Sequence, residues 1–249
     1  VSAVTDMSDL FYDTSGIYSS FNENISGWDV SSVLNMEYMF NKATSFNQPL
    51  NDWNVSSVTK MEDMFREASS FNRTLSNWDT SNVTHMADMF KEAISFDHSI
   101  NNWNVSKVTN MNSMFKDATN FNQPLNDWDV SKVKDMGDML HNARFFNKPL
   151  NDWNVSSVTT MEDMFKNLHD FNQPLNNWNV SNVSNMYRMF GDARSFNQSI
   201  TNWNVSKVTD MSNMFTRATA FNQNIGDWDI SNVNSAIDFA QDTNISTNN

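Results

Sequence analysis

All nine tryptophans of this 249-residue chain are spaced 25 residues apart, and this period constrains the fold more than any other feature. Counting Trp as position 1, the repeat reads W-[DN]-V-S-x-V-T-x-M-x-x-M-F-x-x-A-x-x-F-N-Q-x-L-x-x. A fixed period of this length indicates a repeat array rather than two globular domains. Residues are located below by these repeat positions. The tryptophans are Trp28, Trp53, Trp78, Trp103, Trp128, Trp153, Trp178, Trp203 and Trp228.

The two ends of the chain depart from the repeat. Residues 1–27 are expected to form an N-terminal partial repeat with a capping loop, because four extra residues separate Phe11 from Phe21. Residues 28–227 are eight full repeats. Residues 228–249 are a degenerate C-terminal repeat, in which Ala236 takes the place of the first Met. Terminal units of repeat arrays are commonly atypical, so we predict one continuous domain.

Hydrophobic spacing within a repeat predicts two kinds of element. The apolar residues around each Trp alternate with polar ones, which is typical of a short strand with one buried face. Met61, Met64, Phe65 and Ala68 follow the i, i+3, i+4, i+7 spacing of a helical face. The predicted fold class is therefore an α/β solenoid, a right-handed leucine-rich-repeat-like array of about nine 25-residue strand–helix units with capping ends.

The repeat also resembles a known family. The stretch V-S-S-V-T-K-M-E-D-M-F-R-E-A-S-S-F at residues 55–71 is similar to the BspA-like leucine-rich repeats of bacterial surface proteins. The closest variant carries W-D-V-S-x-V-T-x-M-x-x-M-F and F-N-Q-P-L, and is found in surface proteins and lipoproteins of low-GC Gram-positive bacteria and mycoplasmas. The resemblance covers nearly the whole chain. It implies a leucine-rich-repeat-like solenoid and an extracellular, cell-surface location.

Composition excludes several classes of function. The chain has no Cys and a net charge of −13, which argues against thiol chemistry and against nucleic acid as a partner. No apolar run approaches 18 residues, so no direct membrane insertion is expected. With five Gly, no HExxH, Walker or GxGxxG motif and no recurring Ser–His–Asp set, the sequence predicts neither an enzyme nor a cofactor. The four His residues fall at unrelated repeat positions.

A row of Asn at position 20 predicts a structural ladder. Side-chain amides at a turn can satisfy backbone groups of the adjacent unit. One member of the row is replaced by Asp97. The predicted ladder residues are Asn47, Asn72, Asn122, Asn147, Asn172, Asn197 and Asn222.

Two further rows of Asp and Asn flank Trp at positions 25 and 2. These residue types are poor strand formers, so their recurrence needs a reason. Either they form lateral hydrogen bonds and block edge growth, or they form an acidic binding strip. Repeated carboxylates could also gather Ca²⁺, but many members are Asn and no EF-hand motif exists, so no metal is predicted. The candidate ligand-binding residues are Asp29, Asp52, Asp79, Asp127, Asp129, Asp152, Asp227 and Asp229.

The predicted function is that of a non-enzymatic bacterial cell-surface repeat domain for adhesion, with a host or matrix protein or a glycan as partner. Two alternatives stay open: a structural spacer that projects a distal domain, and a binder of a periodic lattice such as ice or a mineral. The lattice-binding alternative is favoured by the uniform rows of outward-facing residues. It is opposed by breaks in the Thr row at position 7, such as Leu34 and Lys134. The Trp row is predicted to be buried in the core.

Overall fold

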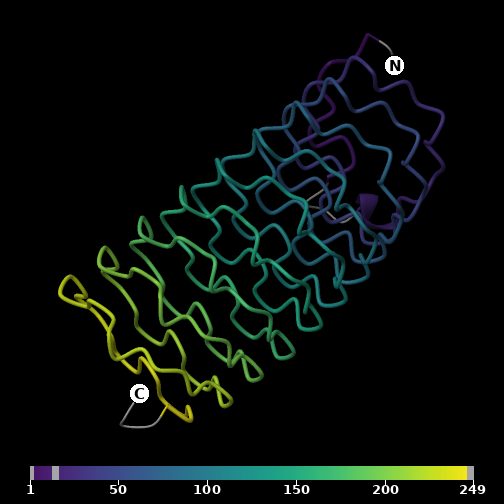
Figure 1. Cartoon of the computed structure of the whole chain (residues 1–249). Helices are drawn as coiled ribbons and strands as arrows, with labels where there is room; N and C mark the ends of the chain where they lie inside the picture. The colour runs from purple at the N-terminus through teal and green to yellow at the C-terminus, as the bar shows by residue number, and fades with distance from the viewer. Residues whose placement is uncertain (1–2, 13–16, 246–249) are drawn as a thin grey trace.

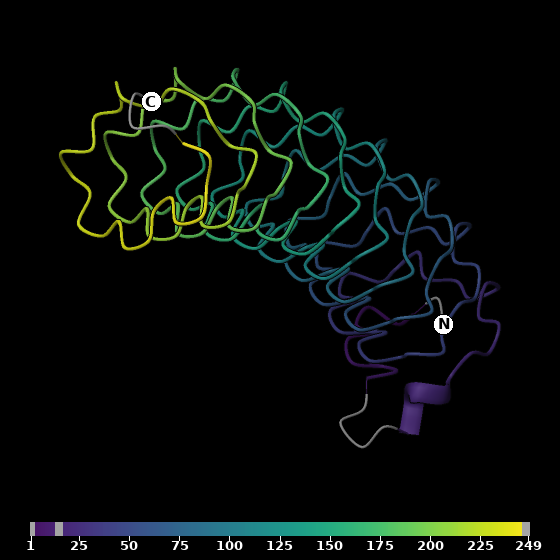
Figure 2. The ribbon, with the colours of Figure 1, turned by 90° about the horizontal axis from the view of Figure 1, so that it is seen from below.

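The computed structural model describes residues 3–12 and 17–245, which wind into a stack of 25-residue coils (Figure 1). Successive coils lie side by side along one axis, and the two ends of the chain lie at opposite ends of the stack. Seen along the perpendicular direction, the stack bends into an arc (Figure 2). Each coil therefore contacts only the coil before it and the coil after it.

The predicted strand–helix units are not found. Among the described residues the only helix is η1, a 3-10 helix at Ile17–Ser20, and no strand is formed. Neighbouring coils share a single isolated parallel bridge at position 8, in a series that runs from Asp6 to Ser235. The α/β solenoid of leucine-rich-repeat-like units is therefore wrong, since residues 3–12 and 17–245 form neither a parallel sheet nor a row of helices. Helix η1 lies within the predicted capping loop, of which residues 13–16 lie outside the described part.

Left-handed residues prevent the predicted helix. Positions 11 and 15 have positive φ in every coil, for example 53° at Asp63 and 57° at Glu67. An α-helix needs φ near −60° at each residue, so two such residues per coil divide the segment into turns. The N–H of Met64 donates to the Met61 carbonyl at 3.3 Å, and that of Ala68 to the Phe65 carbonyl at 3.1 Å. A positive φ at the third residue is the mark of a type II turn.

In the segment at positions 9 to 15, every second backbone N–H donates to a carbonyl of the next coil instead of one in its own coil. The Met61 N–H donates to the His85 carbonyl at 3.0 Å, and the Phe65 N–H to the Met89 carbonyl at 2.9 Å. Because the remaining N–H groups close i to i+3 turns, the side chains at positions 9, 12, 13 and 16 all point inward. The apolar spacing of the sequence therefore imitates a helix although the backbone is a series of turns.

On the Trp side the coils are joined by side chains rather than by a backbone ladder. The Trp128 N–H closes a turn with the Leu125 carbonyl at 3.2 Å, which excludes the predicted strand there. Its indole Nε1 donates to the Ile100 carbonyl of the preceding coil at 3.0 Å. Every Trp from Trp53 to Trp228 makes the equivalent bond. The predicted burial of the Trp row is confirmed, with Trp128 only 3% exposed.

Position 20 forms a second side-chain seam. The backbone N–H of Asn147 donates to Asn122 Oδ1, and that of Asn172 to Asn147 Oδ1, both at 3.1 Å. The row is continuous from residue 22 to residue 222. Asp97 fits into it, because its carboxylate oxygen accepts the Asn122 N–H at 3.0 Å. The position therefore needs a side-chain acceptor oxygen, which both Asn and Asp supply.

The two kinds of seam account for the curvature. At position 13, beside the backbone ladder, the Phe165 and Phe190 ring centroids are 5.3 Å apart. At position 1, the Trp153 and Trp178 centroids are 6.4 Å apart. Direct backbone hydrogen bonds hold chains about 4.8 Å apart, whereas a side-chain link spans a longer gap. We infer that positions 9 to 15 lie on the inner side of the arc and the Trp row on the outer side.

Replacing Trp128 with Ala should lower the free energy of unfolding by roughly 3–5 kcal/mol, because it empties a close-packed site and leaves the Ile100 carbonyl unpaired. Phe145→Ala is the control, since that ring is 55% exposed and its loss should change stability by less than about 0.5 kcal/mol. Urea unfolding followed by circular dichroism measures both. Equal effects of the two variants would mean that the indole carries no core energy.

The position-20 seam is tested by Asn147→Ala, which removes the acceptor of the Asn172 N–H and should cost roughly 1–2 kcal/mol. Asn147→Asp keeps the acceptor oxygen, as Asp97 does in its own coil, and should cost far less. Thermal unfolding of the two variants at neutral pH compares them. If Asp destabilises as much as Ala, the seam depends on something other than an acceptor oxygen.

Candidate functional site

The rows at positions 25 and 2 share one face, which we call the Asx face. They flank the buried Trp row on either side. All eight Asp residues predicted to bind ligand have exposed side chains in the structure. The Asp and Asn members of each row repeat once per coil, so the face presents two parallel polar lines along the stack.

Position 2 is occupied by a turn-forming side chain. Asp29 Oδ1 accepts the Ser31 N–H at 3.1 Å and the Ser31 hydroxyl at 2.6 Å. Asn154 Oδ1 accepts the same two groups of Ser156, at 3.2 and 2.7 Å. Asp and Asn form this turn interchangeably, because only the shared Oδ1 is required. The second carboxylate oxygen, or the amide nitrogen, is left on the outer surface.

These hydrogen bonds also keep the carboxylates ionised. The hydroxyl and the backbone N–H of Ser131 lower the pKa of Asp129 below its ordinary value. Ser31 and Ser231 lower the pKa values of Asp29 and Asp229 in the same way. Hydrogen bonds to the charged form favour it, so these Asp side chains are held in the ionised form.

Position 25 is less uniform. Asp127 Oδ2 accepts a hydrogen bond from Asn101 Nδ2 at 2.5 Å, and its Oδ1 accepts one from Asn126 Nδ2 at 2.7 Å. Asp152 makes no side-chain hydrogen bond within the described part of the chain. The row thus combines lateral links between coils, as at Asp127, with carboxylates such as Asp152 that have no side-chain partner among the described residues.

The Asx face is hollowed where the two rows run past the Trp row. A groove of about 310 Å³ has walls formed by Asp152 and Asn154 of one coil and by Asn177 and Asn179 of the next. Edges of Trp153 and Val155 line it as well. Acceptor and donor groups therefore line a shallow groove between these two coils.

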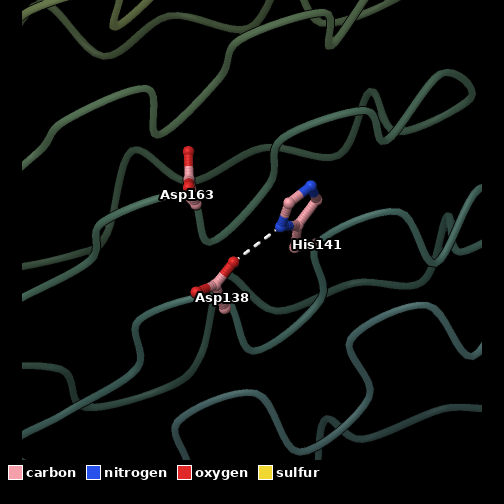
Figure 3. A group of neighbouring side chains, drawn as sticks. All are labelled: Asp138, His141 and Asp163. Carbon is pink, nitrogen blue, oxygen red and sulfur yellow. Dashed lines mark hydrogen bonds and ion pairs between the residues drawn. The ribbon is translucent and has the colours of Figure 1, made fainter. Parts of the chain in front are cut away.

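A different cluster lies on the turn side of the coils. Asp138, His141 and Asp163 bring one possible metal-ligand atom each to within 4.8 Å of one another, the only such trio within the described residues (Figure 3). The His141 ring Nδ1 lies 2.6 Å from Asp138 Oδ1. Sequence reasoning found the four His residues, His141 among them, at unrelated repeat positions and missed this cluster.

Cations already neutralise the two carboxylates. Lys116 Nζ is 3.0 Å from Asp138, and Arg188 Nε is 3.1 Å from Asp163. Burial alone would raise the pKa of Asp138, but hydrogen bonds from His141 and Lys116 outweigh it and lower that pKa to about 2. With positive charges at this distance the trio is an ion-pair network and disfavours a divalent cation.

The sequence carries a sign of this network: an acid recurs at position 11 and a base at position 14. Lys91 pairs with Asp88 at 2.9 Å, and Arg66 with Asp63 at 3.3 Å. Both members of each pair belong to the same turn. The spacing is visible in the sequence, but the prediction of a helix in this segment concealed its meaning.

The Asp138 network predicts a pH dependence of stability. The pKa of Asp138 is lower in the folded chain than in the unfolded chain, so the unfolded chain binds more protons in acid. The contribution of ionised Asp138 to the free energy of unfolding is therefore complete above about pH 4 and is lost as pH falls toward about 2. It amounts to about 2 kcal/mol at most. Asp138→Asn should flatten the stability profile between these pH values, measured by urea unfolding. An unchanged slope would show that Asp138 is not held ionised.

Comparison with known proteins places the chain in a repeat family. Within residues 3–12 and 17–245, no helix is long and apolar enough to cross a bilayer. No curated protein matches the chain. The family model described as "Mycoplasma protein of unknown function, DUF285" matches three overlapping segments, residues 1–82, 72–173 and 146–249. The match identifies a repeat family without singling out the BspA-like repeats, and it names no enzymatic activity. The chain belongs to the DUF285 family of Mycoplasma proteins of unknown function.

Proposed function

We propose that the chain is a non-enzymatic binding domain whose Asx face holds a hydroxyl-rich ligand, such as a glycan chain lying along the stack. The observation that carries this proposal is the groove between the two Asx rows. Its walls, Asp152 and Asn154 with Asn177 and Asn179, offer exposed carboxylate and amide groups. Carboxylates accept hydrogen bonds from hydroxyls, and amides both donate and accept, which suits a sugar.

The Trp row supports the groove without acting as a stacking platform. Trp153 is 3% exposed and its indole N–H is bonded to the Leu125 carbonyl, so the ring face is not available to a sugar. Polar contacts at the surface are individually weak. Repetition of the same two rows in each coil compensates, because contacts linked along one ligand chain add their effects.

A cell-surface location and a BspA-like adhesive role are the finer parts of this proposal. Their support is the W-D-V-S-x-V-T-x-M-x-x-M-F repeat and its similarity to bacterial surface proteins. A role in binding, rather than catalysis, is supported by the Asx face, where the same groups recur in every coil. Catalytic sites instead assemble different groups around one reacting position.

The lattice-binding alternative is disfavoured by the Thr row. The Thr59 hydroxyl donates to the Leu34 carbonyl of the preceding coil at 3.1 Å, and the Thr209 hydroxyl does the same to Ser184. These hydroxyls hold the coils together instead of presenting a regular array outward. The exposed Leu34 side chain also interrupts the row.

The proposal is tested by replacing Asp127, Asp129 and Asp152 with Asn, which removes three charges and keeps the Oδ1 acceptors but loses the bond from Asn101 Nδ2 to Asp127 Oδ2. We expect only a small change in melting, because that lost bond is a single exposed one, and at least about 10-fold weaker glycan binding, because charged acceptors form the stronger hydrogen bonds. A glycan array identifies the ligands of the parent chain, and calorimetry compares the variants on the best of them.

The matched control replaces Asp170, Asp238 and Asp242 with Asn. These side chains are exposed and lie away from the Asx face. The control therefore removes the same three negative charges as the test variant, but from another part of the surface. Equal loss of binding in both triple variants would assign the effect to overall charge. Absence of any array signal for the parent chain would reject the glycan and leave the structural spacer.

A further inference from the structure

An excess of positive charge is concentrated on three successive coils in the C-terminal half of the stack. Two buried carboxylates, those of Asp163 and Asp192, each hold two bases at ion-pair distance, and both carboxylate side chains are only 7% exposed. No other carboxylate in the described part of the chain pairs with these bases. Four positive charges therefore face two negative ones. The bases are Lys166 and Arg188 at Asp163, and Arg194 and Arg217 at Asp192.

A pocket of about 190 Å³ opens between these bases, and we call it the basic pocket. Lys166, Arg188 and Arg217 line it, one from each of the three coils, together with Asn213. They occupy positions 11, 14 and 15, on the inner side of the arc (Figure 2). Asp192 is the one acid in the lining, and it already holds two bases. The pocket wall is therefore positive in a chain whose net charge is −13.

A missing side chain helps to make room for the basic pocket. Gly191 lines the pocket at position 14, between Lys166 of the preceding coil and Thr216 of the following one. Every other coil from residue 28 onward carries a larger residue at this position. The φ of Gly191 lies outside the left-handed region, so the backbone does not demand glycine there. A side chain introduced at this position would occupy the space.

Several N–H groups at the basic pocket have no acceptor among the described residues. Arg188 Nε is buried and lacks a hydrogen-bond partner, although it lies 3.1 Å from Asp163 Oδ1. Lys166 Nζ comes no closer to Asp163 than 3.6 Å, which is too far for a hydrogen bond. The side-chain amide of Asn213 uses only its oxygen, which accepts the Thr216 hydroxyl. Buried donors are normally satisfied, so these groups suit an acceptor from outside the chain.

We propose that the basic pocket binds a tetrahedral oxyanion, such as the phosphate or sulfate group of a larger ligand. A dianion supplies the two negative charges that the four bases lack. Its oxygens point in several directions and can meet donors from three coils, whereas a carboxylate has two oxygens in one plane. Arg pairs well with such groups, because two parallel N–H bonds of its guanidinium match two oxygens.

The overall charge of the chain confines this binding to one place. A net charge of −13 repels anions from most of the surface, so an anion that binds must meet a local positive potential. Only part of that potential is screened by salt, because the two carboxylates and Arg188 Nε are buried. The basic pocket is also separate from the Asx face, which lies at positions 25 and 2.

Isotope labelling of glycine nitrogen alone tests the site directly, because the chain has only five Gly. Inorganic phosphate, inorganic sulfate and acetate are titrated separately at constant ionic strength, and the amide signals are followed by NMR. We expect the Gly191 signal to shift saturably with phosphate and sulfate, with a Kd on the order of 1 mM. The signals of Gly27 and Gly137 should not move. The tighter of the two anions indicates whether a phosphate or a sulfate ester is the natural group.

A charge variant with a matched control separates the pocket from overall charge. Arg217→Gln should weaken phosphate binding at least about 10-fold, because it removes one of the three lining bases. Its side chain is 60% exposed and Asp192 keeps Arg194, so the fold should be unaffected. Lys132→Gln removes one positive charge from an exposed residue outside the pocket and should leave the Kd unchanged.

A second variant fills the pocket without touching the bases. Gly191→Asn installs the residue that Asn41 provides at the same position, and loss of its amide signal also assigns Gly191. Phosphate should raise the melting temperature of the parent chain, since a ligand bound only to the folded state stabilises it. This rise should be absent in Gly191→Asn, measured at the same ionic strength in phosphate and in chloride.

The proposal would be overturned by a Gly191 signal that does not shift saturably, by acetate binding as tightly as phosphate, or by equal effects of Arg217→Gln and Lys132→Gln. A melting rise that persists in Gly191→Asn would also overturn it. Circular dichroism confirms that each variant is folded. Failure of anion binding would leave the glycan proposal standing, and failure of the glycan screen would leave the basic pocket.

Discussion

Hydrogen bonding between neighbouring coils is the constraint on which this structure depends. With no helix beyond η1 and no sheet in the described residues, a coil cannot satisfy its own backbone, and each one is completed by the next. On the inner side the bonds run directly between backbones, as from Met61 to His85. On the outer side Asn, Asp and Trp side chains reach across, as from Trp128 to Ile100. The abundance of Asn follows from this second seam.

The sequence predicted the period, the burial of Trp and the inward rows of Met and Phe, because these follow from apolar spacing alone. It did not predict the local backbone. Asp63 and Glu67 are ordinary helix-surface residues by type, yet both adopt positive φ, since the N–H groups around them are used by the next coil. Bonds between residues 24 or 25 apart carry no local sequence signal, so the turns were taken for helices and strands.

The candidate site was only partly accessible to the same reasoning. The Asp and Asn rows were recognised because they repeat, and the structure brings members of both rows together at the groove beside Trp153. The contacts of their oxygens could not be predicted: Asp129 bonds locally to Ser131, Asp127 bonds across to Asn101, and Asp152 has no such bond. The ion pairs around Asp138 vary from coil to coil, so a consensus repeat averages them away.

At positions 2 and 20 the backbone needs only the side-chain Oδ1 as an acceptor, so the charge of the side chain can vary while the backbone stays the same. Asn and Asp present the same oxygen, and the chain already exchanges them at Asp97 within a row of Asn. An Asn→Asp substitution in these rows would therefore add a negative charge to the outer face while leaving the seam intact. The surface potential of this protein can change by point mutation without any change in the backbone that carries it.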